Sequence, residues 1–287
     1  MFVVRALIAV SNFQKIDAAS ACLYSLVEHD YAEGNRILLT CDNGGKPYTL
    51  TRAGNPEHPL LKEVDSLDMP SAPEAVQSLR EALGIDIVCL HTGKREGVAV
   101  NKNRAIHYFL NHPEFDELLL LDDDIVMTGA GLLEACRETN EPHMTGMLGG
   151  QENAVFGSVK APFFETFPVM GARKTHVYAA GSMGMMLWFT REAVERAGYF
   201  NKMPDFYGAE HSLYSNRINA LYGKFIDWFP ILKDCGRFFI SQSIPNNYKA
   251  DYEKNMKYWA KLKPEIFKGI NLKVTSPGFN IKDIHEA

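Results

Sequence analysis

Short apolar runs alternate with stretches of helical spacing through the first 121 residues of the chain. Strand-length runs of β-branched and aliphatic residues occupy 3–10, 35–41, 85–90 and 118–121. Apolar positions recur at helical spacing in 16–29, 73–83 and 98–110. A strand–helix repeat of this kind predicts an α/β fold, with a parallel sheet and crossover helices.

The second half of the chain has a weaker pattern. Residues 140–174 contain several Gly and Pro residues without a clean period, so we expect a loop-rich segment there that shapes a substrate cleft. A similar Gly- and Pro-rich excursion is expected between residues 42 and 73. Further strands are predicted at 181–190, 225–228 and 238–241, and further helices at 192–197, 209–221 and 248–262. A tail is expected beyond Pro264, and its His285 is expected to be disordered rather than to fold back over a bound ligand.

Composition excludes several classes of protein. Hydrophobic residues make up 46% and charged residues 23% of the chain, which is ordinary for a globular protein. The net charge is −5 and no basic tract is interleaved with aromatic residues, so no nucleic-acid partner is expected. No run approaches the roughly 20 apolar residues that span a bilayer, and the apolar start is too short for a signal peptide. We therefore expect a cytoplasmic protein without a transmembrane segment.

The five cysteines are scattered along the chain and form no CxxC pair. Such a set suggests neither a zinc knuckle nor a disulfide framework. Several of these cysteines lie in apolar segments, so we expect buried thiols in a reducing compartment.

Three consecutive carboxylates, Asp122, Asp123 and Asp124, directly follow four leucines. Carboxylates at a buried strand end repel one another unless a cation lies among them. If the strand continues, Asp122 and Asp124 project to the same side, and their spacing suits Mg²⁺ or Mn²⁺, which also binds substrate phosphates. The alternative is a solvated acidic turn. Asp42 also follows a predicted strand, so both acidic positions are expected at the edge where parallel sheets bind ligands.

An apolar strand followed by Asp-x-Asp, after strand–helix repeats, resembles the GT-A glycosyltransferases of the family 2-like group. Further segments are similar to that group in order and spacing: AVSN at 9–12 with LYSL at 23–26, ILLTCDNG at 37–44, GVAVNKNRAI at 97–106, and GSMGMML, TREAV, GYF and YGAEH between 181 and 211. The resemblance covers about residues 3–217. It implies an α/β GT-A fold, with a mostly parallel central sheet flanked by helices and an irregular C-terminal acceptor lobe.

The resemblance also implies a single domain, 1–287, whose segments have different functions. Residues 1–127 are expected to form the nucleotide-sugar-binding half, 128–245 the acceptor and catalytic half, and 246–287 a C-terminal helix and tail. The expected metal ligands for Mn²⁺ or Mg²⁺ are Asp122 and Asp124. The donor is expected to be a UDP-linked sugar, and its expected contacts come from Ser11, Asn12, Asp42, Lys94, Lys102, Asn103, Asp122 and Asp123.

The expected catalytic pair is Glu210 and His211, where this sequence departs from the Glu-Asp pair usual in the group. An inverting transfer needs a base near the hydroxyl of the saccharide or other acceptor, and either residue suits that role. The unperturbed pKa of histidine, about 6.5, favours proton transfer near neutral pH. An inverting reaction is preferred over a retaining one, and the choice between the two bases stays open.

Three other interpretations compete with this one. A haloacid-dehalogenase-like phosphatase would use Asp122 as nucleophile and Asp124 as acid or base, but its motif belongs to the first strand. A sugar nucleotidyltransferase would open with a Gly-rich basic loop, which residues 10–14 do not resemble. A non-catalytic sugar-nucleotide-binding protein with the same fold would lack the acids that this chain retains.

Overall fold

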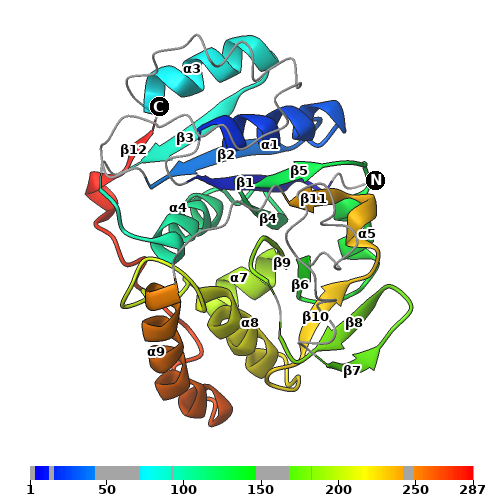
Figure 1. Cartoon of the computed structure of the whole chain (residues 1–287), viewed down its shortest axis with the longest axis vertical. Helices are drawn as coiled ribbons and strands as arrows, with labels where there is room; N and C mark the ends of the chain where they lie inside the picture. The colour runs from blue at the N-terminus through cyan, green and yellow to red at the C-terminus, as the bar shows by residue number, and fades with distance from the viewer. Residues whose placement is uncertain are drawn as a thin grey trace.

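The computed structural model describes residues 4–12, 16–42, 72–91, 94–146, 168–181, 183–241 and 249–286 (Figure 1). The strands are β1 Ala6–Asn12, β2 Arg36–Cys41, β3 Ile87–His91, β4 Glu117–Asp122, β5 Ile125–Met127, β6 His143–Gly146, β7 Val169–Ala172, β8 His176–Ala179, β9 Met186–Thr190, β10 Phe229–Leu232, β11 Phe239–Ser241 and β12 His285–Glu286. The helices are α1 Ile16–Glu28, α3 Ala72–Leu83, α4 Val98–Asn111, α5 Leu132–Arg137, α7 Arg191–Ala197, α8 Glu210–Leu221 and α9 Lys249–Phe267. Most of the excursion expected at 42–73, and the middle of the loop-rich segment, 147–167, lie outside the described residues.

The four strands predicted in the first half form one parallel array in the order β3-β2-β1-β4. In this array Ser11 of β1 lies opposite Thr40 of β2 on one side and Asp122 of β4 on the other. Because the strands are parallel, their carboxyl ends share one edge of the sheet, the edge at which such sheets bind ligands. The strand–helix prediction for the first half is confirmed.

The second half extends the same sheet with mainly antiparallel strands, in the order β4-β9-β6-β10-β8-β7. The expectation of a mostly parallel sheet therefore holds for the first half only. Since β9 runs antiparallel to β4, its first residue, Met186, lies beside Leu121 at the carboxyl edge. The backbone N–H of Asp122 donates to the carbonyl of Met185 at 2.8 Å. This reversal brings the segment before β9 to the acidic strand end.

Side-chain alternation along β4 divides the core between the two faces of the sheet. Leu119 and Leu121 join the buried cluster that contains α1 and α5, whereas Leu118 and Leu120 join the cluster that contains α4, α7 and α8. The run of leucines is therefore buried on both faces, as expected of a central strand in an α/β sheet.

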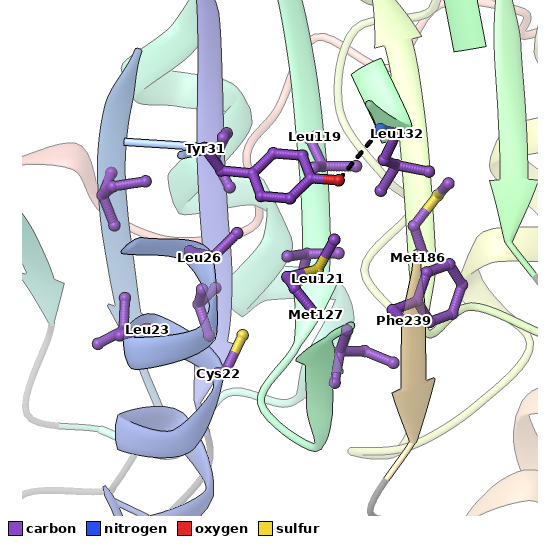
Figure 2. Close-up of a cluster of buried hydrophobic side chains, with 14 of the residues drawn as sticks. Cys22, Leu23, Leu26, Tyr31, Leu119, Leu121, Met127, Leu132, Met186 and Phe239 are labelled. Atoms are coloured by element: carbon purple, nitrogen blue, oxygen red, sulfur yellow. Dashed lines mark hydrogen bonds between the residues drawn. The ribbon is translucent and has the colours of Figure 1, made fainter. Parts of the chain in front are cut away.

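Figure 2 shows the first of these clusters, in which side chains of α1 face those of β4, β5, β9 and β11. The hydroxyl of Tyr31 accepts a hydrogen bond from the backbone N–H of Leu132 at 3.0 Å and donates to the carbonyl of Gly129 at 2.9 Å. These bonds fasten the start of α5 over the cluster. All five cysteines are buried free thiols, as predicted.

Two predicted elements are placed differently in the structure. The strand predicted at 225–228 lies four residues later, as β10, because Asp227 takes a left-handed conformation (φ 63°) in a turn. Asn216 fixes that turn by accepting from the Asp227 backbone N–H at 2.8 Å. The last helix does not stop before Pro264 but continues to Phe267, with Ile266 buried in the core. Proline removes one backbone donor in the helix, and the burial of Ile266 offsets that loss.

Within the described residues, no helix combines the length and apolar character needed to cross a membrane.

The fully buried His143 of β6 predicts an acid-sensitive fold. Its ring stacks on Phe189, and neither ring nitrogen has a hydrogen-bond partner among the described residues. Burial lowers the pKa of His143 to about 3, with the charges of Glu141 and Lys224 acting in opposite directions. The unfolded chain takes up this proton near pH 6.5, whereas the native state does so only near pH 3, so stability falls as pH falls between these values.

Between pH 7 and pH 4 the natural chain should lose about 3 kcal/mol more folding free energy than His143→Phe. The substitution keeps an aromatic ring at this position and removes the group that titrates. Urea unfolding at both pH values measures this difference. His29→Gln, at a partly exposed position, is the matched control and should lose as much stability as the natural chain. Equal losses for His143→Phe and the natural chain would contradict the argument.

Candidate active site

The alternation of side chains along β4 decides where the first two aspartates point. Asp122 has the parity of Leu118 and Leu120, so it faces the helices α4 and α8. Asp123 lies in the turn after β4 and accepts a hydrogen bond from Nδ2 of Asn12 at 2.9 Å. The two neighbouring carboxylates therefore contact different elements.

Lys102 of α4 connects the acidic strand end to α8. Its side chain is 1% exposed, and its Nζ lies 3.1 Å from Oδ1 of Asp122 and 3.3 Å from Oε1 of Glu210. The ammonium group also donates to the carbonyl of Gly184 at 3.1 Å. Burial alone disfavours a charged lysine, but the two carboxylates raise the pKa of Lys102 above its usual value. Lys102 is therefore a buried cation between two acids.

Glu210 is the first residue of α8 and is buried. Burial by itself would raise its pKa, but the charge of Lys102 and the contact with His211 lower the pKa of Glu210 to about 2. Nδ1 of His211 lies 3.7 Å from Oε1 of Glu210, and the His211 side chain is 14% exposed. The predicted catalytic pair thus places a buried carboxylate behind an imidazole that reaches the surface.

Gly184 makes room for this pair. A Cβ atom at this position would lie 2.7 Å from Nδ1 of His211, which is closer than real Cβ contacts allow. The same glycine supplies the carbonyl that Lys102 contacts. The sequence signal for Gly184 was its place in the Gly181–Gly184 segment, but its contact with His211 was not predictable from that pattern.

Asp124 does not follow the alternation expected from a continuing strand. The strand ends at Asp122, and Asp124 lies in the turn before β5, where Oδ2 accepts from Oγ of Ser241 at 3.3 Å. Desolvation raises the pKa of Tyr207 to about 12, and the charges of Asp122, Glu210 and Asp124 add to this shift. The strand argument for placing Asp122 and Asp124 on the same side was therefore wrong, and their shared role as metal ligands stays a prediction.

Ser11 and Asn12 lie where the resemblance predicts, at the end of β1. Ser11 is opposite Asp122, and its Oγ is buried without a hydrogen-bond partner among the described residues. Such a group is available to a ligand at this edge. The backbone carbonyl of Asn12 accepts from Nδ2 of Asn101 at 3.2 Å, which ties β1 to α4.

Asp42 holds the start of α4. Its two oxygens accept from the backbone N–H groups of Glu96 at 2.7 Å and Gly97 at 2.8 Å, and the guanidinium of Arg104 lies 3.5 Å away. Burial raises the pKa of Asp42, while these contacts act against that shift. Gly97 has a φ of 91°, and a Cβ there would lie 2.9 Å from Cα of Phe206. The contact of Asp42 with a nucleotide stays a prediction, and its structural role was not visible in the sequence.

Asn103 and Lys94 lie on the side of the C-terminal tail. Nδ2 of Asn103 donates to the carbonyls of Phe200 at 3.0 Å and Pro277 at 2.9 Å, so it joins the tail to the segment before α8. Lys94 is exposed and pairs with Asp283 at 2.9 Å. Neither side chain contacts the acidic strand end in these interactions, and their donor contacts stay predictions.

His285 lies in a strand, contrary to expectation, because β12 pairs with β3. His285 lies opposite His91, and their ring centroids are 5.3 Å apart. Strands β3, β2 and β1 separate β12 from β4. Neighbouring strands lie roughly 4.8 Å apart, so His285 is roughly 19 Å from the line of β4 and does not complete a metal site with Asp122.

The residues present fit a divalent cation that shares its ligands with a substrate. Among the described residues, no three His, Cys, Asp or Glu side chains converge as a closed metal site. The Asp122 side chain is 34% exposed, and Oδ1 is its contact with Lys102. Mg²⁺ and similar ions use one or two carboxylates together with phosphate oxygens, so an open set of this kind suits them.

Comparisons with known proteins place this fold. No family model and no curated protein match the sequence. The structure is similar to the mannosyltransferase PcManGT from Pyrobaculum calidifontis in complex with GDP-Man and Mn²⁺, with a TM-score of 0.55 and 13% identity, over 95% of this chain and 70% of that one. It is also similar to S. aureus TarS, with a TM-score of 0.53 and 13% identity, over 91% of this chain but only 39% of TarS.

A third similar structure is TarS 1–349 in complex with UDP-GlcNAc, with a TM-score of 0.51 and 11% identity, over 86% of this chain and 61% of that one. At these identities the comparisons establish the architecture rather than the substrates. The chain has a GT-A-like glycosyltransferase fold.

Proposed function

We propose that this protein is a metal-dependent glycosyltransferase, which moves a sugar from a nucleotide-diphospho-sugar to an acceptor hydroxyl. The donor is UDP-linked and the reaction inverting. The observation that carries the proposal is the bridge from Asp122 through Lys102 to Glu210, at the ligand-binding edge of the parallel strands. It places an open carboxylate, a buried cation and the predicted catalytic pair next to one another.

The donor's diphosphate is expected at Asp122 and Asp124. These two residues would hold the Mn²⁺ or Mg²⁺ ion, which would stabilise the charge of the departing diphosphate. Asp123, which accepts a hydrogen bond from Asn12, fixes the turn between them, and the Ser11 hydroxyl, which has no partner among the described residues, lies beside Asp122. The similar structures named with GDP-Man and with UDP-GlcNAc support a nucleotide-sugar donor.

The base is His211, with Glu210 behind it. Glu210 is buried and its carboxylate contacts Lys102, whereas His211 is partly exposed and can meet an acceptor hydroxyl. A carboxylate next to an imidazole orients the ring and stabilises the imidazolium formed on proton uptake. In this arrangement Glu210 orients the imidazole ring and stabilises its protonated form, and His211 accepts the proton of the acceptor hydroxyl.

The same contacts argue against the alternative functions. A phosphatase of the haloacid-dehalogenase type would need its nucleophile on the first strand, whereas Asp122 ends β4 and contacts Lys102. A non-catalytic sugar-nucleotide-binding protein would have no need of a buried Glu210 beside a partly exposed His211. Neither alternative accounts for the GT-A-like architecture together with this pair.

Asp124→Asn should weaken the binding of UDP in the presence of Mn²⁺ by at least about tenfold, or about 1.4 kcal/mol. With EDTA in place of Mn²⁺ the variant and the natural chain should bind equally, because only the cation-dependent part is lost. Isothermal calorimetry measures both. Asp86→Asn, at an exposed acid directly before β3 and therefore at the amino ends of the parallel strands, is the matched control. Unchanged affinity with Mn²⁺ in Asp124→Asn would remove this residue from the site.

Glu210→Gln and His211→Ala should each lower turnover by about 10²–10⁴-fold while donor affinity stays within about threefold. His211→Ala removes the base and Glu210→Gln removes the carboxylate that supports it, whereas neither change removes a proposed donor contact. Turnover of the donor and donor calorimetry, measured on the same preparations, separate the two effects. Added imidazole should restore part of the activity of His211→Ala only. Equal losses of turnover and donor affinity would move the pair into a binding role.

Lys102→Met should destabilise the fold by about 3–5 kcal/mol, because it leaves the buried Glu210 carboxylate uncompensated. Adding Glu210→Gln should recover about 1–3 kcal/mol of that loss, since the amide needs no counter-charge. Urea unfolding of the natural chain, both single variants and the double variant gives the double-mutant cycle that measures this coupling. Additivity within about 0.5 kcal/mol would mean that the two side chains are not coupled.

A further inference from the structure

A cavity lies among α8, the end of α9 and the tail that follows α9. Figure 1 shows the two helices side by side. The cavity is lined by Arg217 of α8, by Asn201 from the segment before α8, and by residues from the range 262–274. Its volume is about 210 Å³. An engineered cavity of about 150 Å³ holds benzene, so this cavity has room for a small organic molecule.

The cavity is separate from the proposed active site. Arg217 follows Glu210 by seven residues on α8, which is two turns, or about 10 Å, along the helix axis. Lys102, Asp122 and His211 are not among the residues that line the cavity. A ligand in this cavity would therefore occupy a second site on the molecule.

The Arg217 side chain is a buried cation that forms no ion pair with a carboxylate among the described residues. It is 1% exposed, and its terminal nitrogens donate to the backbone carbonyls of Ala197 at 3.0 Å and Tyr199 at 2.6 Å. Its Nε has no hydrogen-bond partner in the described part of the chain. Burial lowers the pKa of Arg217 to about 10, so the group is still charged at neutral pH. A buried charge is costly unless it is paired, and an anion in the cavity would pair with this one.

Two hydrogen-bond acceptors line the same cavity. Oδ1 of Asn201 is buried and has no hydrogen-bond partner among the described residues. Oε2 of Glu265 accepts from Nδ2 of Asn271 at 2.9 Å, and both of these residues also line the cavity. A ligand with an O–H or N–H group would satisfy the Asn201 oxygen, and the charge of Glu265 favours an ammonium group.

The other walls of the cavity are mainly aliphatic, with Leu262, Ile266, Ile270 and Val274 among the lining residues. Ile266 is 4% exposed and belongs to the core, whereas Ile270 is 48% exposed, so the wall extends to the surface of the molecule. Ligand sites commonly combine apolar walls with a few polar groups that fix the orientation of the ligand. These walls favour a ligand with an aliphatic body.

We propose that this cavity binds a small aliphatic carboxylic acid that also carries an ammonium or hydroxyl group. The carboxylate lies against Arg217, the ammonium or hydroxyl group donates to Oδ1 of Asn201, and the aliphatic body contacts the apolar walls. A guanidinium is the side chain best suited to bind a carboxylate, because its donors match the two carboxylate oxygens. Amino acids and hydroxy acids share this chemistry. The site is independent of the proposed glycosyl transfer.

Isothermal calorimetry on the full chain tests this site with four probes of similar aliphatic body: leucine, 2-hydroxy-4-methylpentanoate, 4-methylpentanoate and 4-methyl-1-pentanol. We expect leucine or the hydroxy acid to bind, and 4-methylpentanoate to bind about tenfold more weakly, because it lacks the group that donates to Asn201. The alcohol, which has no carboxylate, should show no binding at millimolar concentration. The tighter of the first two probes identifies the ligand as an amino acid or a hydroxy acid.

Asn201→Leu should weaken the tighter of these two probes about tenfold while the affinity for 4-methylpentanoate stays within about twofold, since only the former donates to Oδ1. Arg217→Met should abolish the binding of all three acids. Because Arg217→Met also removes donors to two backbone carbonyls, thermal melting checks its fold, and Asn201→Leu decides the question if it does not fold. Lys268→Met, which removes an exposed cation outside the cavity, is the matched control and should bind as the natural chain does.

Binding that requires the carboxylate, and that Asn201→Leu weakens only for a probe with a donor group, supports the inference. No binding of any acid at millimolar concentration would mean that the cavity holds water only, and overturns it. Affinities that Asn201→Leu leaves unchanged, or equal affinities for the alcohol and the acids, overturn it as well. None of these measurements uses a nucleotide sugar, so Mn²⁺-dependent hydrolysis of such donors reports on the proposed function separately.

Discussion

The arrangement of the site depends on one buried cation, Lys102, held between Asp122 and Glu210. A charge taken out of water is costly unless it is paired, so the three side chains constrain one another. They belong to α4, β4 and α8, which come together only when the two halves of the chain pack on the same sheet. The contact that stabilises this packing is also the contact that orders the proposed active site.

The antiparallel strand β9 completes this arrangement. Its direction brings Gly184 to the carboxyl edge, where a larger residue would collide with His211. Asp42 and Arg104 fix the entry to α4 from the other side. Around the acids, Asn255 of α9 holds the loop that carries Tyr207. The C-terminal helix α9, which lies beyond the segments that carry the sequence resemblance, therefore supports a loop that leads into α8.

The sequence predicted the first half well because each element there has a local signal. The leucines before Asp122 and the Ser-Asn end of β1 are patterns of period and position, and the structure places them at the expected edge. The same local logic failed at Asp124, because it assumed a strand where the chain turns. It also missed the pairing of β12 with β3, which depends on residues almost 200 positions apart. Short strands such as β6 and β8 owe their conformation to neighbours in the sheet rather than to their own period.

For the polar residues of the site, too, the contacts in the structure differ from what the motifs predicted. Lys102 was expected to contact the donor because of its motif, yet its contacts are with two acids of the protein itself. The partners of Asn103 and Asp42 are backbone groups that no motif reveals. Residues within these motifs therefore also hold the backbone of the site in place. Only the three-dimensional contacts distinguish such residues from those that could contact substrate.

The most direct test of the central claim is a crystal structure of the protein soaked with Mn²⁺ and UDP. The account predicts a manganese ion bound by the carboxylates of Asp122 and Asp124 at about 2.1 Å, the distance usual for a Mg²⁺-like ion, with diphosphate oxygens completing its coordination and Lys102 still between Asp122 and Glu210. Asp122 and Asp124 facing only water, with UDP bound elsewhere, would contradict it.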